Sequence, residues 1–321
     1  MPNTVPPVLT ADEAVGYRNS ILLETHERFP QFQPVMTIKL TMNTTAEMIN
    51  DAANAGVKAV KLYPTGATTN SQDGVDLAKI RDLDTVLWTM AARKMLLLIH
   101  AEEPTQPVLS REPYTIELID SLRSNNPQLK IVIEHVSTKE MAKYIVGSSR
   151  DKRLAATVTL HHLYLTLDDL LGDMLRPDYF CKPVVKRQED VEYLWFSIVH
   201  CDNFFFGSDS APHEERSKLS HTCAAGVFSG PICIPLLAQL FATSAHLQSK
   251  TLAERIGLME QFTSVRGADF YGLPVNAQTI TLEQCDEPQA LPAKLVFGSD
   301  NGSTVLPMPL RKGEELFWRV I

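Results

Sequence analysis

The sequence predicts an α/β fold, a (β/α)8 TIM barrel formed by one domain that spans residues 1–321. Three observations favour this fold. Short apolar runs of strand length alternate with segments of helical periodicity, which is typical of a parallel sheet with helices outside. Neither a low-complexity linker nor a repeat of solenoid length divides the chain, and its length suits one large barrel. No G-x-G-x-x-G follows a strand-like run, which disfavours a dinucleotide-binding fold.

Six strand-like runs and four helical segments can be placed along the chain. The first ten residues, MPNTVPPVLT, contain no strand and lack the charged and apolar regions of a secretory signal. Runs with a β-branched or aromatic bias follow: PVMTIKLTM (34–42), VKAVKLYP (57–64), MLLLIHAE (95–102), LKIVIEHV (129–136), LAATVTLHH (154–162) and FFFGSD (204–209). Apolar residues three and four positions apart predict helices between them, at 45–55, 77–93, 138–147 and 187–200.

Composition narrows the classes of protein to which the chain can belong. With 44% hydrophobic and 21% charged residues it is an ordinary globular sequence, and no apolar run approaches the roughly 20 residues that span a bilayer. A net charge of −8 without a Lys/Arg cluster disfavours nucleic acid and favours a small-molecule partner. The five cysteines are scattered and form no C-x-x-C pair, so we expect a soluble protein of the reducing cytoplasm.

Residues able to bind a metal or to titrate stand where four of the predicted strands end. They are Lys61 after VKAV, His100 after LLLI, His135 after IVIE, and Asp209 after FFFGS. In a parallel barrel the carboxyl ends of the strands share one face, so we expect these side chains to converge. Taken alone, each histidine is more simply a hydrogen-bonded core residue, and Asp209 a helix cap or Asx turn. The joint pattern favours a metal centre.

Of the four residues, Lys61 is the hardest to explain by a purely structural role. A buried ammonium costs several kcal/mol unless it is paired, and the usual relief is a neutral amine. A neutral amine can form a Schiff base, or it can add CO2 to give a carbamate that bridges two metal ions. The two histidines favour the carbamate, because imidazole, carboxylate and carbamate are all acceptable Zn²⁺ ligands.

Several motifs together identify a family. MPNTVPP, KLYPTGATTN, LIHAEEP, IEHVSTKE, CKPVVK, GSDSAPH, CAAGVFSGP and FYGLPVN together resemble dihydroorotase of the single-function bacterial and fungal type, in the amidohydrolase superfamily. The resemblance runs from residue 1 to the C-terminus. It implies a (β/α)8 barrel with two zinc ions per subunit that interconverts N-carbamoyl-L-aspartate and L-dihydroorotate in de novo pyrimidine (UMP) synthesis. It also implies a homodimer.

The resemblance assigns roles to individual residues. Lys61 matches the carbamylated lysine that bridges the zinc ions, His100 and His135 match ligands of the more exposed zinc, and Asp209 matches a ligand of the other zinc that also shuttles the proton. Substrate-binding roles fall on side chains for the carboxylate (Asn3, His213), backbone groups for the pyrimidine edge (Ala225, Gly226) and a loop that closes over the substrate (Thr68, Thr69). Lys182 and the pair His161–His162 are expected to be structural or to support the ligands.

One family motif is missing from the sequence. Dihydroorotases carry an H-x-H on the first strand with an Arg two residues further on, and no two of the nine histidines here are separated by one residue. We therefore expect a barrel that is incomplete at the N-terminus, lacking the first strand and helix, with one zinc site impaired. The alternative function is a catalytically weak or inactive dihydroorotase-like barrel that acts as a scaffold or assembly partner. A Schiff-base lyase that uses Lys61 is a third, weaker hypothesis.

Overall fold

The structure, a computed structural model, describes residues 2–297 and 302–321. The chain divides into two units by its internal contacts: residues up to Glu134 together with Asp151–Ala155, and His135–Arg150 together with Ala156–Ile321. The single domain over 1–321 stays a prediction. None of the described helices is both long and apolar enough to cross a membrane.

The first unit is built on parallel strands that pair in chain order. They are β1 (Thr37–Leu40), β2 (Ala59–Leu62), β3 (Leu96–Ile99) and β4 (Lys130–Ile133). The register places Lys39 opposite Lys61, and Lys61 opposite Leu98. All four residues of β2 and of β3 are buried, as expected for parallel strands covered on both faces.

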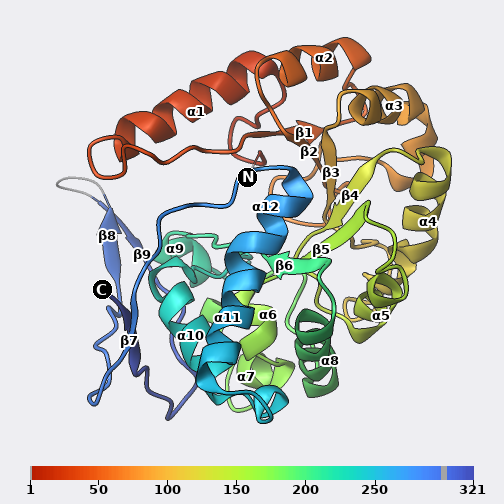
Figure 1. Ribbon diagram of the computed structural model, residues 1–321. Coiled ribbons are helices and arrows are strands. Elements are labelled where there is room, and N and C mark those ends of the chain that lie inside the picture. The colour runs from red at the N-terminus through yellow and green to blue at the C-terminus, as the bar shows by residue number, and fades with distance from the viewer. Residues whose placement is uncertain (1, 298–301) are drawn as a thin grey trace. The chain divides into compact units, whose positions relative to one another are not determined.

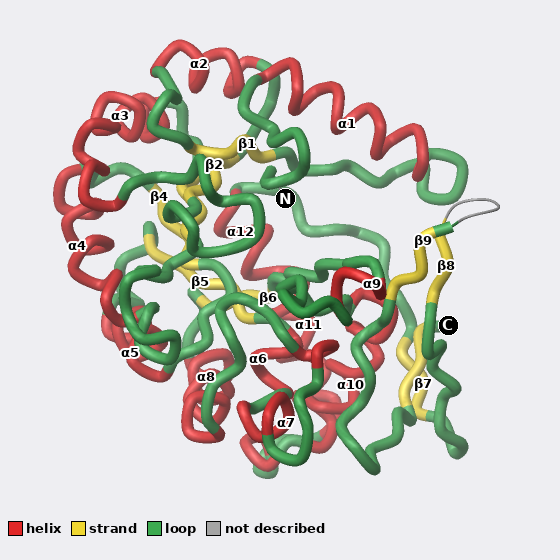
Figure 2. The backbone as a smooth tube through the Cα atoms, turned by 180° about the vertical axis from the view of Figure 1, so that it is seen from behind, coloured by secondary structure: helices red, strands yellow, loops and turns green. Residues whose placement is uncertain are grey.

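Helices precede or connect these strands and lie on their outer side (Figures 1 and 2). They are α1 (Ala11–Thr25), α2 (Ala46–Asn54), a 3-10 helix (Leu77–Leu83) that leads into α3 (Asp84–Ala92), a 3-10 turn (Pro113–Thr115), and α4 (Ile116–Asn125). Local sequence sets their starts: the Thr45 side chain accepts from the Met48 amide, and Thr10 forms a capping box with Glu13. Gly56, at φ 84°, lies just beyond α2, where a left-handed residue turns the chain toward β2.

The second unit carries the remaining parallel pairing and most of the short helices. β5 (Leu154–Val158) begins in the first unit and pairs through Ala156–Val158 with β6 (Phe204–Phe206). Its helices are α5 (Lys139–Gly147), α6 (Leu160–Tyr164), α7 (Leu167–Leu171), α8 (Gln188–His200), α9 (Glu215–Lys218), α10 (Cys233–Thr243), α11 (Leu252–Glu260) and α12 (Arg266–Tyr271). A π-helical turn, Gln261–Val265, joins α11 to α12.

Two antiparallel pairs lie near the C-terminus of the second unit. β7 (Leu282–Gln284) pairs with β10 (Trp318–Val320), and β8 (Leu295–Phe297) pairs with β9 (Ser303–Val305). The sequence analysis placed no elements in this region. Each strand has three residues, too short for an alternating pattern to stand out.

All six predicted strands and all four predicted helical segments are confirmed. Two segments differ in detail. The run 154–162, predicted as strand throughout, ends as a strand at Val158, and its last residues begin α6 (Leu160–Tyr164), which the Thr159 side chain caps by accepting from the His162 amide. Residues 77–93, predicted as a single helix, form the 3-10 helix followed by α3, because Leu83 leaves helical geometry at φ −99° and ψ 8°.

The buried strands should dominate stability. Leu97, in β3, is 0% exposed, whereas Leu23, in α1, is 80% exposed. We expect Leu97→Ala to lower the free energy of unfolding by about 2–5 kcal/mol, because it leaves a cavity in a close-packed sheet. Leu23→Ala removes the same atoms from a solvated surface and should change it by less than about 0.5 kcal/mol. Urea unfolding of both variants checks this, and equal losses would contradict the assignment of the core.

Candidate active site

Lys61 is buried and paired. It is the third residue of β2 and is 1% exposed, and its ammonium forms an ion pair with the Glu134 carboxylate at the end of β4. The ammonium also lies 5.1 Å from the centre of the Tyr63 ring, a cation–π distance. Burial at a strand end predicts an unpaired amine that loses its charge. The structure provides a counter-charge instead, so the ammonium is compensated without modification.

His100 directly follows β3 and contacts a second buried carboxylate. Its Nε2 lies 2.8 Å from Glu102 Oε2, and both side chains are about 1% exposed. Burial lowers the pKa of His100, although the hydrogen-bonded Glu102 carboxylate acts in the opposite direction. A neutral imidazole that donates from Nε2 carries its lone pair on Nδ1, and such a carboxylate partner commonly orients metal-binding histidines.

In the second unit, two predicted ligands have unusual backbone geometry. His135 has φ 45° and Asp209 has φ 39°, both in the left-handed region that costs a non-glycine residue about 1–3 kcal/mol. The His135 amide donates to Thr157 Oγ1 at 2.7 Å, which fixes the turn after β4. Asp209 lies three residues beyond β6. Strain of this kind clusters at functional sites and supports a role that demands an exact side-chain direction.

Three residues of the second unit that are predicted to contact the substrate, His213, Ala225 and Gly226, lie next to one another. His213 Nε2 is 2.9 Å from the carbonyl oxygen of Ala225. Gly226, at φ 154°, packs so closely on His213 that a Cβ there would lie 2.7 Å from the imidazole ring. The Lys218 ammonium donates to the carbonyls of Ala224 and Gly226 at 3.0 and 2.8 Å and holds this loop. Only glycine fits this position.

Asn3 and the threonine loop are joined by hydrogen bonds within the first unit. Asn3 Nδ2 donates to the Thr69 carbonyl at 3.1 Å, and Tyr63 Oη donates to Asn3 Oδ1 at 3.1 Å. Ser71 Oγ donates to the Thr68 carbonyl at 2.6 Å. The structure therefore joins Asn3 to the loop that carries Thr68 and Thr69.

Sequence reasoning missed the residue that anchors this loop. Lys39, 1% exposed, donates to the Asn70 carbonyl at 2.7 Å and forms an ion pair with Asp73. Asn70 in turn donates from Nδ2 to the Asn3 carbonyl at 3.0 Å. A signal was present, because TIKL in β1 repeats the pattern of AVKL in β2 and predicts a second buried lysine in register.

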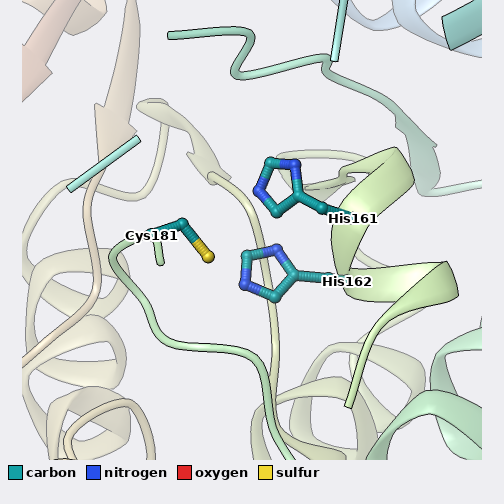
Figure 3. A group of neighbouring side chains, drawn as sticks. All are labelled: His161, His162 and Cys181. Carbon is teal, nitrogen blue, oxygen red and sulfur yellow. The ribbon is translucent and has the colours of Figure 1, made fainter. Parts of the chain in front are cut away.

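A further cluster joins His161 and His162 of α6 to Cys181 (Figure 3). Burial lowers the pKa of His161 to about 3, and the Lys218 ammonium adds to the shift. Burial also raises the pKa of the Cys181 thiol to about 12, with the Asp209 carboxylate acting in the same direction. At neutral pH the cluster is therefore uncharged.

Comparison with known proteins decides the family. No family model matches the chain. Curated dihydroorotases from Ruegeria pomeroyi and Neisseria meningitidis serogroup C are each 38% identical to it, over 100% of the chain and 88% of the relative. The dihydroorotase of Saccharomyces cerevisiae in complex with 5-fluoroorotic acid matches 100% of the chain and 88% of its own, with a TM-score of 0.87 and 29% identity. The chain belongs to the dihydroorotase family.

Other solved structures agree with this membership. The dihydroorotase of Campylobacter jejuni is 33% identical, with a TM-score of 0.84 over 100% of the chain and 86% of its own. The L-hydantoinase of Arthrobacter aurescens, at 16% identity and a TM-score of 0.72, shares the fold alone. Dihydroorotases are TIM-barrel amidohydrolases, so the predicted fold class and family are confirmed.

The residues present fit the zinc on which dihydroorotases depend. His100 is an imidazole whose pKa burial lowers and whose ring the Glu102 carboxylate orients. His135 and Asp209 add a nitrogen and a carboxylate donor on strained turns. Nitrogen and oxygen donors of this kind are those of catalytic zinc sites.

The lysine anchor should control the threonine loop. Lys39→Met keeps the length of the side chain but removes the bonds to Asn70 and Asp73, so the loop should open more often. We expect amide hydrogen exchange over residues 66–73 to accelerate at least about tenfold, equivalent to a loss of about 1.4 kcal/mol. Lys79→Met is the matched control, because its ion pair with Asp76 lies on the surface. If the exchange rates of residues 66–73 were unchanged in Lys39→Met, Lys39 would not be the anchor of this loop.

The buried imidazole of His161 should make the metal-free protein sensitive to acid. The unfolded chain binds this proton below about pH 6.5, whereas the folded chain does so only near a pKa of about 3. Between these values the free energy of unfolding should fall with decreasing pH, by up to about 1.4 kcal/mol per unit from this group. His161→Leu should reduce that slope in urea titrations with a chelator present. His221→Leu, at an exposed position, should not, and a wild-type slope in His161→Leu would refute the assignment.

Proposed function

We propose that this chain is a dihydroorotase, a metal-dependent cyclic amidohydrolase that interconverts L-dihydroorotate and N-carbamoyl-L-aspartate in de novo pyrimidine biosynthesis. The observation that carries the proposal is the 38% identity to dihydroorotases across the entire chain. It favours the enzyme over the scaffold. The same identity favours this activity over a Schiff-base lyase that uses Lys61.

In this proposal Lys61 acts as a carbamate. Its deprotonated amine adds to CO2, forming an N–C bond and releasing a proton, so that a cation becomes an anion. The carbamate and three further residues, His100, His135 and Asp209, would hold the zinc ions. When bound, two zinc ions polarise the substrate carbonyl and acidify a water molecule enough for it to attack near neutral pH.

Asp209 would move the proton. It accepts the proton of the attacking water as the new C–O bond forms at the ring carbonyl carbon. It then donates this proton to the amide nitrogen as the C–N bond of the ring breaks, which yields the open-chain product. Cyclisation follows the same steps in reverse and releases water. The strained φ of 39° at Asp209 supports a carboxylate held in one direction for this transfer.

The proposed substrate contacts are already hydrogen-bonded within each unit. Asn3 and His213 would bind the substrate carboxylate, exchanging their contacts to Thr69 and Ala225 for bonds to the ligand. Backbone groups of Ala225 and Gly226 would fix the pyrimidine edge. Thr68 and Thr69 would close over the ring and exclude water. The rigid packing of His213 on Gly226 supports a preformed pocket wall.

The proposal also includes a homodimeric assembly and a cytoplasmic location. The resemblance to the family supports a homodimer. All five cysteines are free thiols, which supports a reducing, cytoplasmic environment.

The proposed centre can be tested through its bridging residue. We expect Lys61→Ala to lose both zinc ions, to lose the intact-mass increment of one CO2, and to reduce dihydroorotate turnover by roughly 10³-fold or more. His100→Ala should chiefly weaken one zinc. Lys58→Ala, three residues upstream and exposed, is the control. Metal analysis, native mass spectrometry and turnover of the zinc-loaded proteins give the readouts.

Two results would contradict different parts of this proposal. Full zinc in Lys61→Ala would exclude the bridging carbamate while leaving the activity open to another metal arrangement. A wild-type protein with full zinc but no dihydroorotate turnover would exclude the function itself.

A further inference from the structure

The cluster of His161, His162 and Cys181 has no role in the proposed reaction. The two histidines are neighbours on α6, and Cys181 lies just after the 3-10 turn Pro177–Tyr179. Their exposed fractions are 0%, 2% and 1%. One donor atom from each lies within 4.8 Å of the other two, and the three side chains point toward one another (Figure 3).

His161 is the member whose state needs explaining. Within the described residues neither of its ring nitrogens has a hydrogen-bond partner, although the side chain is completely buried. A buried polar group left in this state costs about 1–3 kcal/mol, and such groups are rare in folded proteins. A ligand that accepts the imidazole lone pair would remove the part of this cost that comes from the acceptor nitrogen.

His162 is already oriented as a metal ligand would be. Its Nε2 lies 3.0 Å from the Pro183 carbonyl, an acceptor, so Nε2 carries the proton and Nδ1 carries the lone pair. Metal-binding histidines are commonly fixed by this bond to a backbone carbonyl. The Thr159 hydroxyl, 2.8 Å from Nδ1, donates to that lone pair in this structure and would have to rotate away when a metal binds.

We propose that His161, His162 and Cys181 form a binding site for a divalent transition-metal cation of the Zn²⁺ class. Two imidazoles and one thiolate are a donor set that Zn²⁺ accepts, with water in the fourth position. Ligands at 2.0–2.3 Å in a tetrahedron are roughly 3.5 Å apart, so the present cluster must contract by about 1 Å. This site uses none of the residues proposed for the dihydroorotase centre and does not depend on that function.

Binding replaces one proton by the metal. The Cys181 S–H bond breaks, its proton leaves to solvent, and an S–metal bond forms, so Zn²⁺ and the thiolate together carry one positive charge. The charged groups nearby are Lys218, which acts on His161, Lys186, which acts on His162, and Asp209, which acts on Cys181. Both ammoniums also act on Cys181, where they favour the thiolate. The two ammoniums oppose the cation and the carboxylate favours it, which argues for moderate rather than extreme affinity.

Cobalt provides a signature specific to this site. Metal-free protein, prepared with a chelator, is titrated with Co²⁺, and thiolate-to-cobalt charge-transfer absorption is recorded. The four proposed catalytic ligands carry only nitrogen and oxygen donors, so this absorption reports a cysteine ligand. We expect it in the wild type and also in Lys61→Ala, which separates this site from the dihydroorotase centre. Added Zn²⁺ should displace it.

Variants then assign the ligands. Cys181→Ser should lose the charge-transfer absorption and bind one Zn²⁺ fewer, whereas Cys233→Ser, at another buried cysteine, should keep both. His161→Ala should weaken Co²⁺ binding at least about tenfold. No charge-transfer absorption in cobalt-saturated wild type would overturn the proposal without any variant having to fold. Absorption that persists in Cys181→Ser would overturn it as well.

Discussion

The first unit depends on the charge compensation of two buried ammoniums on adjacent strands. Lys39 and Lys61 are paired across β1 and β2 in register, and both are 1% exposed. Like charges at this spacing would repel strongly in a medium that water does not reach. Each is offset by its own carboxylate, Asp73 for Lys39 and Glu134 for Lys61, and the Tyr63 ring lies 6.0 and 5.1 Å from the two ammoniums. Lys39 holds the threonine loop through the Asn70 carbonyl, and Lys61 pairs with Glu134 at the end of β4. Asn3, a proposed substrate contact, is hydrogen-bonded to the same loop.

The same balance would couple the proposed carbamylation of Lys61 to metal binding. Carbamylation turns a cation into an anion, so the Glu134 carboxylate would change from a partner into a neighbour of like charge. Such a pair of anions is unfavourable in a buried site unless a cation compensates both. In the proposed enzyme, zinc would supply that charge. The ion pair of the unmodified chain and the carbamate of the proposed enzyme are therefore two charge-balanced states of one site, selected by CO2 and metal together.

The sequence predicted most of the fold and placed the candidate site residues at strand ends, because both rest on local pattern. Fully apolar runs such as LLLI identify buried parallel strands, and His100 is visible as the first polar residue after one. The partners of these residues were not predictable. Glu134 is 73 residues from Lys61, and Asp73 is 34 from Lys39, so no periodicity links them. The short C-terminal strands were missed because three residues carry too little pattern.

Protons and metal ions compete for the same electrons in the histidine–cysteine cluster. Burial without partners keeps His161 neutral down to a pKa of about 3, which makes the folded state intolerant of acid but keeps the lone pairs available at neutral pH. Burial acts oppositely on Cys181, holding the thiol proton in place until a cation displaces it. Such a cluster therefore favours a divalent metal ion over a proton. Protonation places a charge in a buried site without a partner, whereas a metal ion of the Zn²⁺ class is bound by two imidazoles and a thiolate.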